Sequence, residues 1–195
     1  IVLRKILIIA NIRESNGGIT TQVCELAEAF QSEGMFVKII STHGSIPKRL
    51  SGVISSFKEA CDYDVILGVG CAYTGFFPIV IASIVSKIKN KKLVLNFHDG
   101  QILDFMKKYY GFIKIIIRDN PVVVATKYLF DTFKHYGFNS ILINNHFNNL
   151  KLTDTRKQTM DKIKIIWARS FENLYRADLA LEAAVGFKNY KNIEF

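Results

Sequence analysis

Cysteine, proline and long apolar runs are all scarce in this sequence of 195 residues. The three cysteines, Cys24, Cys61 and Cys71, lack C-x-x-C spacing, which excludes a disulfide scaffold and favours a reduced, cytoplasmic compartment. Three prolines and twelve glycines are too few for collagen-like or linker-type sequence. The longest apolar run, residues 75–85, contains Pro78 and is shorter than the roughly 20 residues that a membrane-spanning helix needs.

Acidic residues are also few relative to basic ones. There are 26 Lys and Arg against 17 Asp and Glu, which gives a formal charge of +9 at pH 7. Such an excess favours anionic partners such as phosphates, nucleic acid or acidic lipid. A lysine-rich proteome, in which the charge only solvates the surface, explains the composition as well. The charge alone therefore selects no partner.

Short apolar runs alternate with amphipathic helical stretches, and 49% of the residues are apolar, which is enough for a packed core. This alternation predicts an α/β fold, a Rossmann-like parallel sheet with helices on both faces. We expect strands at residues 5–10, 36–42, 64–69, 92–97, 122–125 and 140–143. We expect helices at 19–31, 51–60, 78–89, 127–136 and 101–118, the last broken in two at Gly111.

Residues 144–161 are polar without a clear period, so we expect a linker there. Residues 1–143 would then form a complete Rossmann-like domain. Residues 162–195 would begin a second, incomplete one with a strand at 162–168 and a helix at 177–187. The chain begins with Ile1 rather than Met and ends in a strand-like pattern, so we expect a piece of a longer protein.

Two glycines separate the first strand from the first helix, in Ser15-Asn16-Gly17-Gly18. In open α/β sheets, ligands bind outside the carboxyl ends of the strands. Free backbone N–H groups at a helix N-terminus attract phosphate or carboxylate, and glycine lets a ligand approach closely. Gly17 and Gly18 are therefore candidate phosphate- or sugar-binding residues, with a plain turn as the alternative.

His98-Asp99-Gly100 follows the fourth predicted strand directly, at the same edge of the sheet. A histidine at that edge can donate a hydrogen bond or act as a general base near neutral pH. Asp99 can also cap the helix that follows, and the two roles are compatible. We take His98 as the candidate catalytic residue, with a simple capping loop as the alternative.

Three further patterns have simpler explanations. Gly68-Val69-Gly70 begins a dinucleotide fingerprint, but Tyr73 stands where the third glycine belongs. Asp62-Tyr63-Asp64 spells the D-x-D of metal-dependent nucleotide-sugar enzymes, yet it precedes its strand and so lies at the opposite edge. The histidines and cysteines have no metal-ligand spacing. We therefore predict no cofactor and no metal.

The stretch 101–118 combines apolar, aromatic and basic residues. One helical face carries Ile102, Phe105, Met106, Tyr109, Ile113 and Ile116. Lys107, Lys108 and Lys114 add positive charge, and a basic, aromatic, amphipathic helix suits a membrane interface. The same apolar face suits burial in the core, which is the interpretation that we favour.

The order of these parts resembles the GT-B glycosyltransferases of family 4, over essentially the whole chain. The matching segments are Gly17-Gly18-Ile19, His98-Asp99, Thr126-Lys127, Ile143-Asn144-Asn145, Ile166-Trp167-Ala168-Arg169 and residues 178–183.

That resemblance implies an acceptor-binding N-terminal domain and a nucleotide-sugar-binding C-terminal domain. The implied reaction is a retaining hexosyl transfer, without a metal, from a nucleotide-sugar to a glycan or lipid-linked glycan, in polysaccharide and cell-envelope assembly. His98 would be catalytic, and Arg169 would bind the donor phosphate. Substrate would be bound by Gly17, Gly18, Asp99 and Asn145. The protein would be cytoplasmic, at the inner face of the membrane, with no nucleic-acid partner.

The chain also departs from the family pattern. Leu174 or Tyr175 stands where a lysine normally follows the arginine, and Ala168 and His146 replace glycines. The acidic E-x7-E segment would lie beyond Phe195, so this chain alone is expected to be inactive. A non-catalytic Rossmann-like binding or membrane-docking module is the alternative function. A nicotinamide oxidoreductase is a second alternative, which is disfavoured because Tyr73 stands where the third glycine of a dinucleotide fingerprint belongs.

Overall fold

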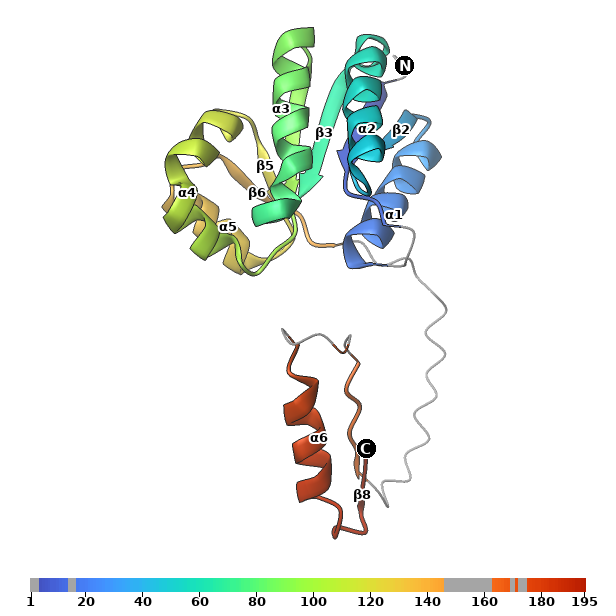
Figure 1. Cartoon of the computed structure of the whole chain (residues 1–195), viewed down its shortest axis with the longest axis vertical. Coiled ribbons are helices and arrows are strands. Elements are labelled where there is room, and N and C mark those ends of the chain that lie inside the picture. Colours follow the sequence, from blue (N-terminus) through green and yellow to red (C-terminus); the bar gives the residue numbers. More distant parts are fainter. Residues whose placement is uncertain (1–3, 14–16, 146–162, 169–170, 172–174) are drawn as a thin grey trace. The chain divides into compact units, whose positions relative to one another are not determined.

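The computed structural model describes residues 4–13, 17–145, 163–168, 171 and 175–195 (Figure 1). The chain forms two compact units, residues 1–148 and residues 149–195. Among the described residues, no helix has both the length and the apolar character needed to cross a membrane.

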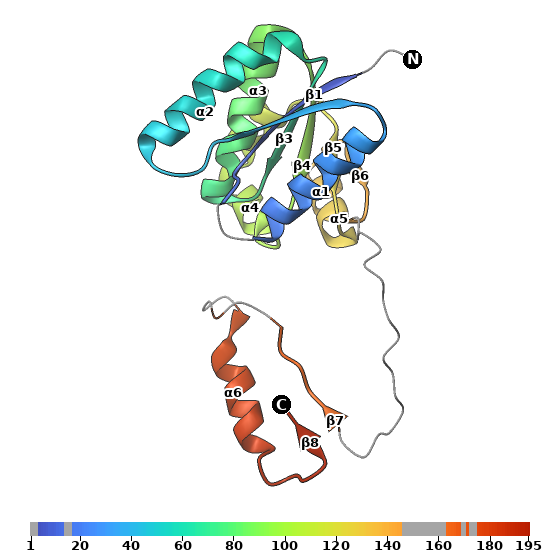
Figure 2. The ribbon, with the colours of Figure 1, turned by 90° about the vertical axis from the view of Figure 1, so that its right-hand side faces the viewer.

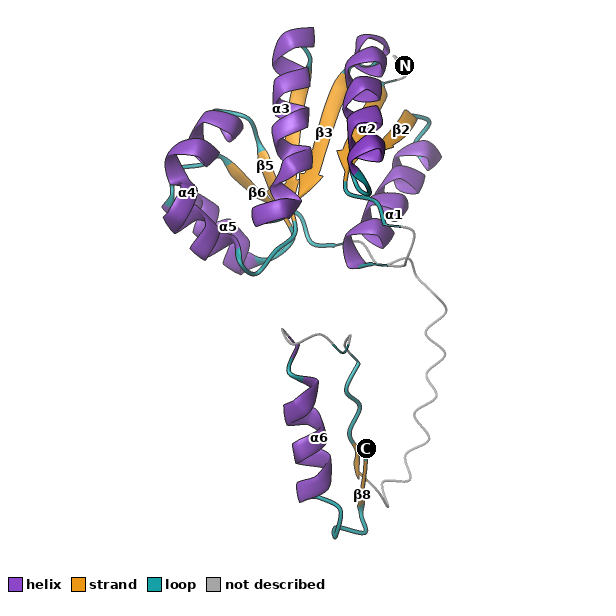
Figure 3. Cartoon of the chain, viewed as in Figure 1, coloured by secondary structure: helices purple, strands orange, loops and turns teal. Residues whose placement is uncertain are grey.

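Unit 1 is built on a sheet of six strands, and every hydrogen-bonded pair of neighbours in it is parallel (Figure 3). The strands are β1 (Lys5–Ala10), β2 (Phe36–Ser41), β3 (Val65–Gly70), β4 (Lys92–Phe97), β5 (Val122–Val124) and β6 (Ser140–Leu142). Their order across the sheet is β2-β1-β3-β4-β5-β6. The predicted Rossmann-like parallel sheet is confirmed.

Five α-helices and two short 3-10 helices connect these strands. They are α1 (Gly18–Ser32), α2 (Ile46–Glu59), η1 (Ala60–Asp62), η2 (Tyr73–Phe76), α3 (Phe77–Lys89), α4 (Ile102–Ile117) and α5 (Lys127–His135). The predicted start of α2 at residue 51 is wrong, because the helix begins at Ile46 with Pro47 in its first turn. Proline favours a helix start. Ile46 is 82% exposed and supplies no buried face from which the helical period could be recognised.

The two faces of the sheet are covered unequally. Helices α2, α3, α4 and α5 pack over one face, against strand residues such as Leu7, Ile66 and Leu95. On the other face, α1 packs its buried Val23 and Ala27 against residues of β1 and β3. Figure 2 shows α1 and α2 on opposite sides of the sheet. Because successive strand residues point to opposite faces, β1 is buried on both.

Helix α4 faces the core, which confirms the favoured interpretation of this stretch. Five of the six residues of its predicted apolar face are buried, namely Ile102, Phe105, Met106, Ile113 and Ile116. Tyr109 was wrongly included, since it is 38% exposed. The predicted break of this helix in two is present, but it does not lie at Gly111. The non-helical backbone lies at Tyr109, with φ −125° and ψ 22°.

Unit 2 contains one β-α-β arrangement in its described part. The strands β7 (Ile163–Lys164) and β8 (Ile193–Glu194) pair in parallel, and α6 (Ala177–Gly186) lies between them in the chain. The strand predicted for residues 162–168 is formed only at Ile163–Lys164 in the described part. No residue of α6 is buried. Most of the predicted linker, residues 146–161, lies outside the described residues.

Candidate functional site

A hollow of about 510 Å³ lies at the carboxyl ends of β4 and β5, beside the start of α1; we call it the carboxyl-edge hollow. Its walls come from α1, from the loop after β4, from the start of α5 and from the segment after β6. Four sequence-predicted residues meet there, Gly18, His98, Asp99 and Asn145. They are distant in sequence, but the carboxyl ends of parallel strands share one edge of the sheet.

The first turn of α1 presents open backbone to this hollow. Gly17 is the N-cap residue, with extended dihedral angles of φ −116° and ψ 151°, and no side chain of a described residue caps the helix. A Cβ atom added to Gly18 would meet nothing within 4 Å. Packing within the described chain therefore does not require glycine at position 18. The site instead leaves room for a ligand at the positive end of the helix dipole.

His98 lies one residue beyond β4 and is fixed by its backbone, whose N–H donates to the Gly70 carbonyl at 3.1 Å. The side chain is half-buried, and burial lowers the pKa of its imidazole. His98 is therefore neutral at pH 7 and can accept a proton at one ring nitrogen. The imidazole has no hydrogen bond to another described residue, so the ring is available to a ligand.

Asp99 holds the loop that carries His98. One carboxylate oxygen accepts a hydrogen bond from the Ala72 N–H at 2.9 Å, and the other accepts from the Gln101 N–H at 2.9 Å. The first bond joins the loop that follows β3 to the loop that follows β4, and the second lies within the loop that follows β4. The predicted capping of α4 by Asp99 is wrong, because the N-cap residue is Gln101 and the helix has no side-chain cap among the described residues; at this helix, Asp99 binds only the N–H of that N-cap residue. The substrate-binding role of Asp99 stays a prediction.

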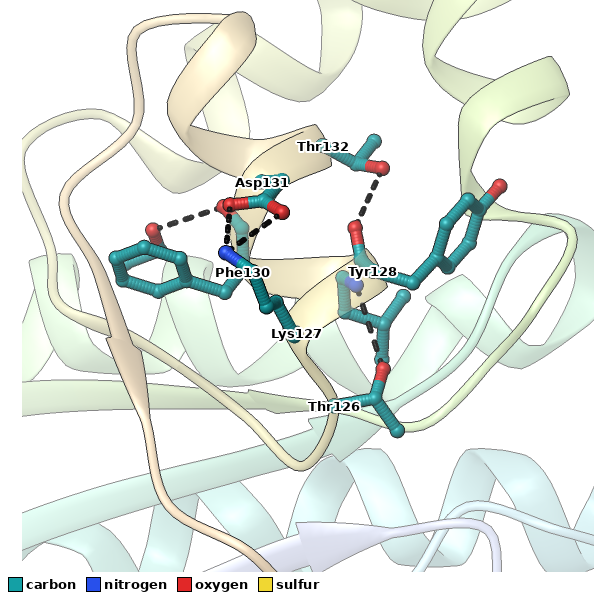
Figure 4. A network of polar contacts seen from close by, with 8 residues as sticks. Thr126, Lys127, Tyr128, Phe130, Asp131 and Thr132 are labelled. Atoms are coloured by element: carbon teal, nitrogen blue, oxygen red, sulfur yellow. Dashed lines mark hydrogen bonds and ion pairs between the residues drawn. The ribbon is translucent and has the colours of Figure 1, made fainter.

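The start of α5 forms another wall of the hollow. Thr126 caps the helix, with its hydroxyl oxygen accepting from the Leu129 N–H at 3.3 Å. Lys127 pairs with Asp131 one turn along the helix, at 3.1 Å between Nζ and Oδ2, and both side chains are exposed (Figure 4). Thr126 lines the hollow, whereas Lys127 does not.

Arg169, the predicted phosphate-binding residue, lies outside the described residues. Gly17 is the N-cap of α1 but does not line the hollow. Sequence reasoning missed Gln22, which lies one helical turn after Gly18 and lines the hollow. The spacing of four residues was the available signal, because residues i and i+4 share a helix face.

The discounted motifs have structural roles. A Cβ atom at Gly68 would lie 2.7 Å from the Ala82 Cβ, and one at Gly70 would lie 2.6 Å from the Gly75 carbonyl oxygen. These glycines therefore let the segment around α3 approach β3. Asp64 accepts a hydrogen bond from the Lys5 N–H, at the amino end of β1, as its position in the sequence predicted. Within the described ranges, no three His, Cys, Asp or Glu residues are grouped to hold a metal.

Comparisons with known proteins support the fold. No protein-family model and no curated protein matches the sequence. One solved structure that resembles the chain is that of Anabaena Alr3699/HepE in complex with UDP, with a TM-score of 0.52 and 16% sequence identity. The match covers 75% of this chain and 45% of HepE, so the chain spans less than half of that protein. The structural similarity supports a GT-B fold. At 16% sequence identity it does not show membership of glycosyltransferase family 4.

Proposed function

We propose that this chain is the acceptor-side part of a GT-B glycosyltransferase, which moves a sugar from a nucleotide-sugar to a hydroxyl group of an acceptor. The observation that carries the proposal is the carboxyl-edge hollow, where a helix N-terminus without a side-chain cap from the described residues and a neutral histidine face one space. HepE, whose fold is similar, was solved with UDP. That supports a uridine diphosphate-sugar as the donor to test first.

The residues of the hollow suit the charges of such a reaction. Diphosphate leaves with negative charge, which backbone N–H groups at the start of α1 stabilise. His98 hydrogen-bonds the transferred sugar or the attacking hydroxyl group, and its lowered pKa keeps it neutral at pH 7. Asp99 positions the histidine loop through its two backbone hydrogen bonds. Asn145 contributes an amide at the far wall.

The donor half of the proposal concerns unit 2. We assign residues 1–143 to the acceptor domain, 144–161 to the linker and 162–195 to the start of the donor domain. Arg169 would neutralise the leaving diphosphate, because a guanidinium forms two parallel hydrogen bonds to phosphate. The resemblance to family 4 supports retention of configuration, hexosyl transfer and a role in envelope polysaccharide assembly.

A lipid-linked glycan is the acceptor class that the exposed side of α4 favours. Phe112 and Ile115 are 50% and 65% exposed, although the rest of the helix packs on the core. Lys108 lies 5.3 Å above the Tyr109 ring and Lys114 lies 5.7 Å above the Tyr110 ring. Exposed aromatic residues beside lysines suit an anionic lipid surface. In this proposal, α4 rests on the inner face of the membrane.

Titration of the 15N-labelled chain with UDP-glucose tests the nucleotide-sugar proposal. We expect weak binding and shifts in the amide signals of Gly18, His98 and Gly100, without turnover by this chain alone. Uridine is the matched control, since it lacks the diphosphate and the sugar that the hollow is proposed to bind. Equal shifts with uridine, or none at millimolar UDP-glucose, would contradict the proposal.

A further inference from the structure

Tyr73 has a left-handed backbone in the loop that leaves β3 at the carboxyl edge of the sheet. Its φ is +53°, a value that favours glycine and that costs free energy in a residue as bulky as tyrosine. Asn90 and Arg118 also have positive φ, but they are the C-cap residues of α3 and α4, where such backbone is common. Tyr73 instead begins η2. Because strained residues are concentrated at functional sites, Tyr73 is a candidate functional residue.

Hydrogen bonds around Tyr73 hold the loop in this conformation and tie it to the proposed site. The Gly75 N–H donates to the Ala72 carbonyl at 3.1 Å and closes a turn around Tyr73. The Ala72 N–H donates to the Asp99 carboxylate at 2.9 Å. Asp99 lines the carboxyl-edge hollow and directly follows His98. The position of Tyr73 is therefore fixed relative to the loop that carries the proposed catalytic histidine.

The Tyr73 ring belongs to an exposed aromatic surface on a buried base. Its centroid lies 5.2 Å from that of the Phe105 ring, and the Tyr109 ring lies 5.3 Å from the same phenylalanine. Phe105 is 5% exposed, whereas Tyr73 and Tyr109 are 44% and 38% exposed. We call these two tyrosines the tyrosine shelf. Both residues have irregular backbone, since Tyr109 is the non-helical residue within α4.

A sugar ring is the ligand whose chemistry suits this shelf. One face of a pyranose consists of C–H groups, which pack against the negative face of an aromatic ring, while its hydroxyl groups stay in contact with water. The proposed function places the donor diphosphate at the start of α1. Helix α4, which carries Tyr109, packs on the opposite face of the sheet from α1. The shelf is therefore separate from the phosphate position and is open to the second substrate.

We propose that the tyrosine shelf binds a sugar ring of the acceptor, with Tyr73 as the residue that selects a glycan over a simple alcohol. The assignment of that ring to the acceptor rests on the proposed function. The binding of a sugar ring by the shelf does not.

Methyl glycosides test the shelf, because they present a sugar ring without phosphate or base. The probes are the methyl β-glycosides of glucose, galactose and N-acetylglucosamine. In 15N-NMR titrations of the 195-residue chain, we expect at least one of them to shift the amides of Tyr73 and Phe105 saturably. Uridine is the control, because its base can also stack on an aromatic ring. Larger shifts of these amides with uridine than with any glycoside would overturn the proposal.

Substitutions at Tyr73 separate the aromatic face from apolar bulk. Tyr73→Phe keeps the ring and should bind the glycoside within about twofold of the wild type, whereas Tyr73→Leu should bind at least about fivefold more weakly. Tyr190→Leu is the matched control and should bind as the wild type does. Tyr190 is 57% exposed and its ring lies 5.6 Å from that of Phe187, but its φ is not positive and it belongs to unit 2. Equal binding by Tyr73→Leu and the wild type would overturn the proposal.

Tyr73→Gly distinguishes ligand binding from packing. Glycine adopts the left-handed backbone without strain, so this variant should keep the urea midpoint of the wild type while losing glycoside binding. A lowered midpoint with glycoside binding retained would make Tyr73 a packing residue and overturn the proposal.

The remaining outcomes separate the shelf from the transferase function. Absence of saturable shifts with all three glycosides would overturn the shelf. A chain that binds a glycoside but shows no UDP-glucose shifts at Gly18 and His98 supports the shelf and refutes the transferase. UDP-glucose shifts without glycoside shifts refute the shelf alone.

Discussion

Replacing Gly18 with alanine separates a ligand-binding role from that of a plain turn. The added Cβ would meet nothing within 4 Å. Alanine in a helix is more favourable than glycine by about 0.4 to 1 kcal/mol, largely because it restricts the unfolded chain. We therefore expect Gly18→Ala to raise the free energy of unfolding by about 0.5 kcal/mol in urea denaturation. The same methyl group occupies the space through which a phosphate would approach α1, so UDP-glucose affinity should fall at least about tenfold.

Gly111→Ala is the matched control for this experiment. Gly111 also lies in a helix, and a Cβ there would also meet nothing within 4 Å, but it does not line the carboxyl-edge hollow. It should stabilise the chain similarly and leave UDP-glucose binding unchanged. If the two variants are equally stabilised and bind UDP-glucose equally well, the glycine pair is only a turn and the reasoning fails.

Three further perturbations have defined outcomes. Burial lowers the pKa of His98, so the unfolded state takes up a proton below about pH 6.5 before the folded state does. The stability of the wild type should fall as the pH drops through that range, and that of His98→Asn should fall less. Thermal melts at stepped pH values measure this difference. Parallel plots of melting temperature against pH for the two proteins would contradict it. Asn96→Leu removes a buried, unpaired polar atom and should raise stability by about 1 kcal/mol in urea denaturation, whereas a loss would indicate that Asn96 has a partner. A triple variant with Glu in place of Lys107, Lys108 and Lys114 should bind anionic vesicles about a hundredfold more weakly, since each of these cations contributes about 1 kcal/mol to binding. Equal pelleting with a control that carries Glu at Lys58, Lys87 and Lys89 would exclude α4 as the membrane face.

Two strands of the sheet could be predicted to the residue, whereas the predicted bounds of β2, β3, β5 and β6 differ from the structure by one residue at one or both ends. The predicted bounds of β1 and β4 agree with the structure, because continuous or alternating apolar residues end at polar ones on both sides. Exposed helix turns could not be predicted in this way. The first turn of α2 and the distortion at Tyr109 leave no mark in the apolar period, since neither changes which residues are buried.

The carboxyl-edge hollow was predictable because strand order is enough to bring Gly18, His98 and Asn145 to one edge. The apolar space beside α1, lined by Leu26, Ala29 and Phe30 among others, was not predictable, because the sequence does not reveal which part of a sheet face the described helices leave uncovered. One signal was available. Asn96 is a polar residue within the otherwise apolar end of β4, and such a residue indicates a face that meets something other than the core.

The central claim is that His98 takes part in sugar transfer. The most direct test is the rate of UDP release from UDP-glucose, with acceptor, by the protein that joins this chain to a complete donor domain. His98→Ala should lower kcat about a hundredfold, the scale of a positioned proton-transfer group, and change the KM for the donor little. His135→Ala, a histidine outside the lining of the hollow, is the control and should leave kcat unchanged. An unchanged kcat in His98→Ala would contradict the account and reduce His98 to a residue of a capping loop.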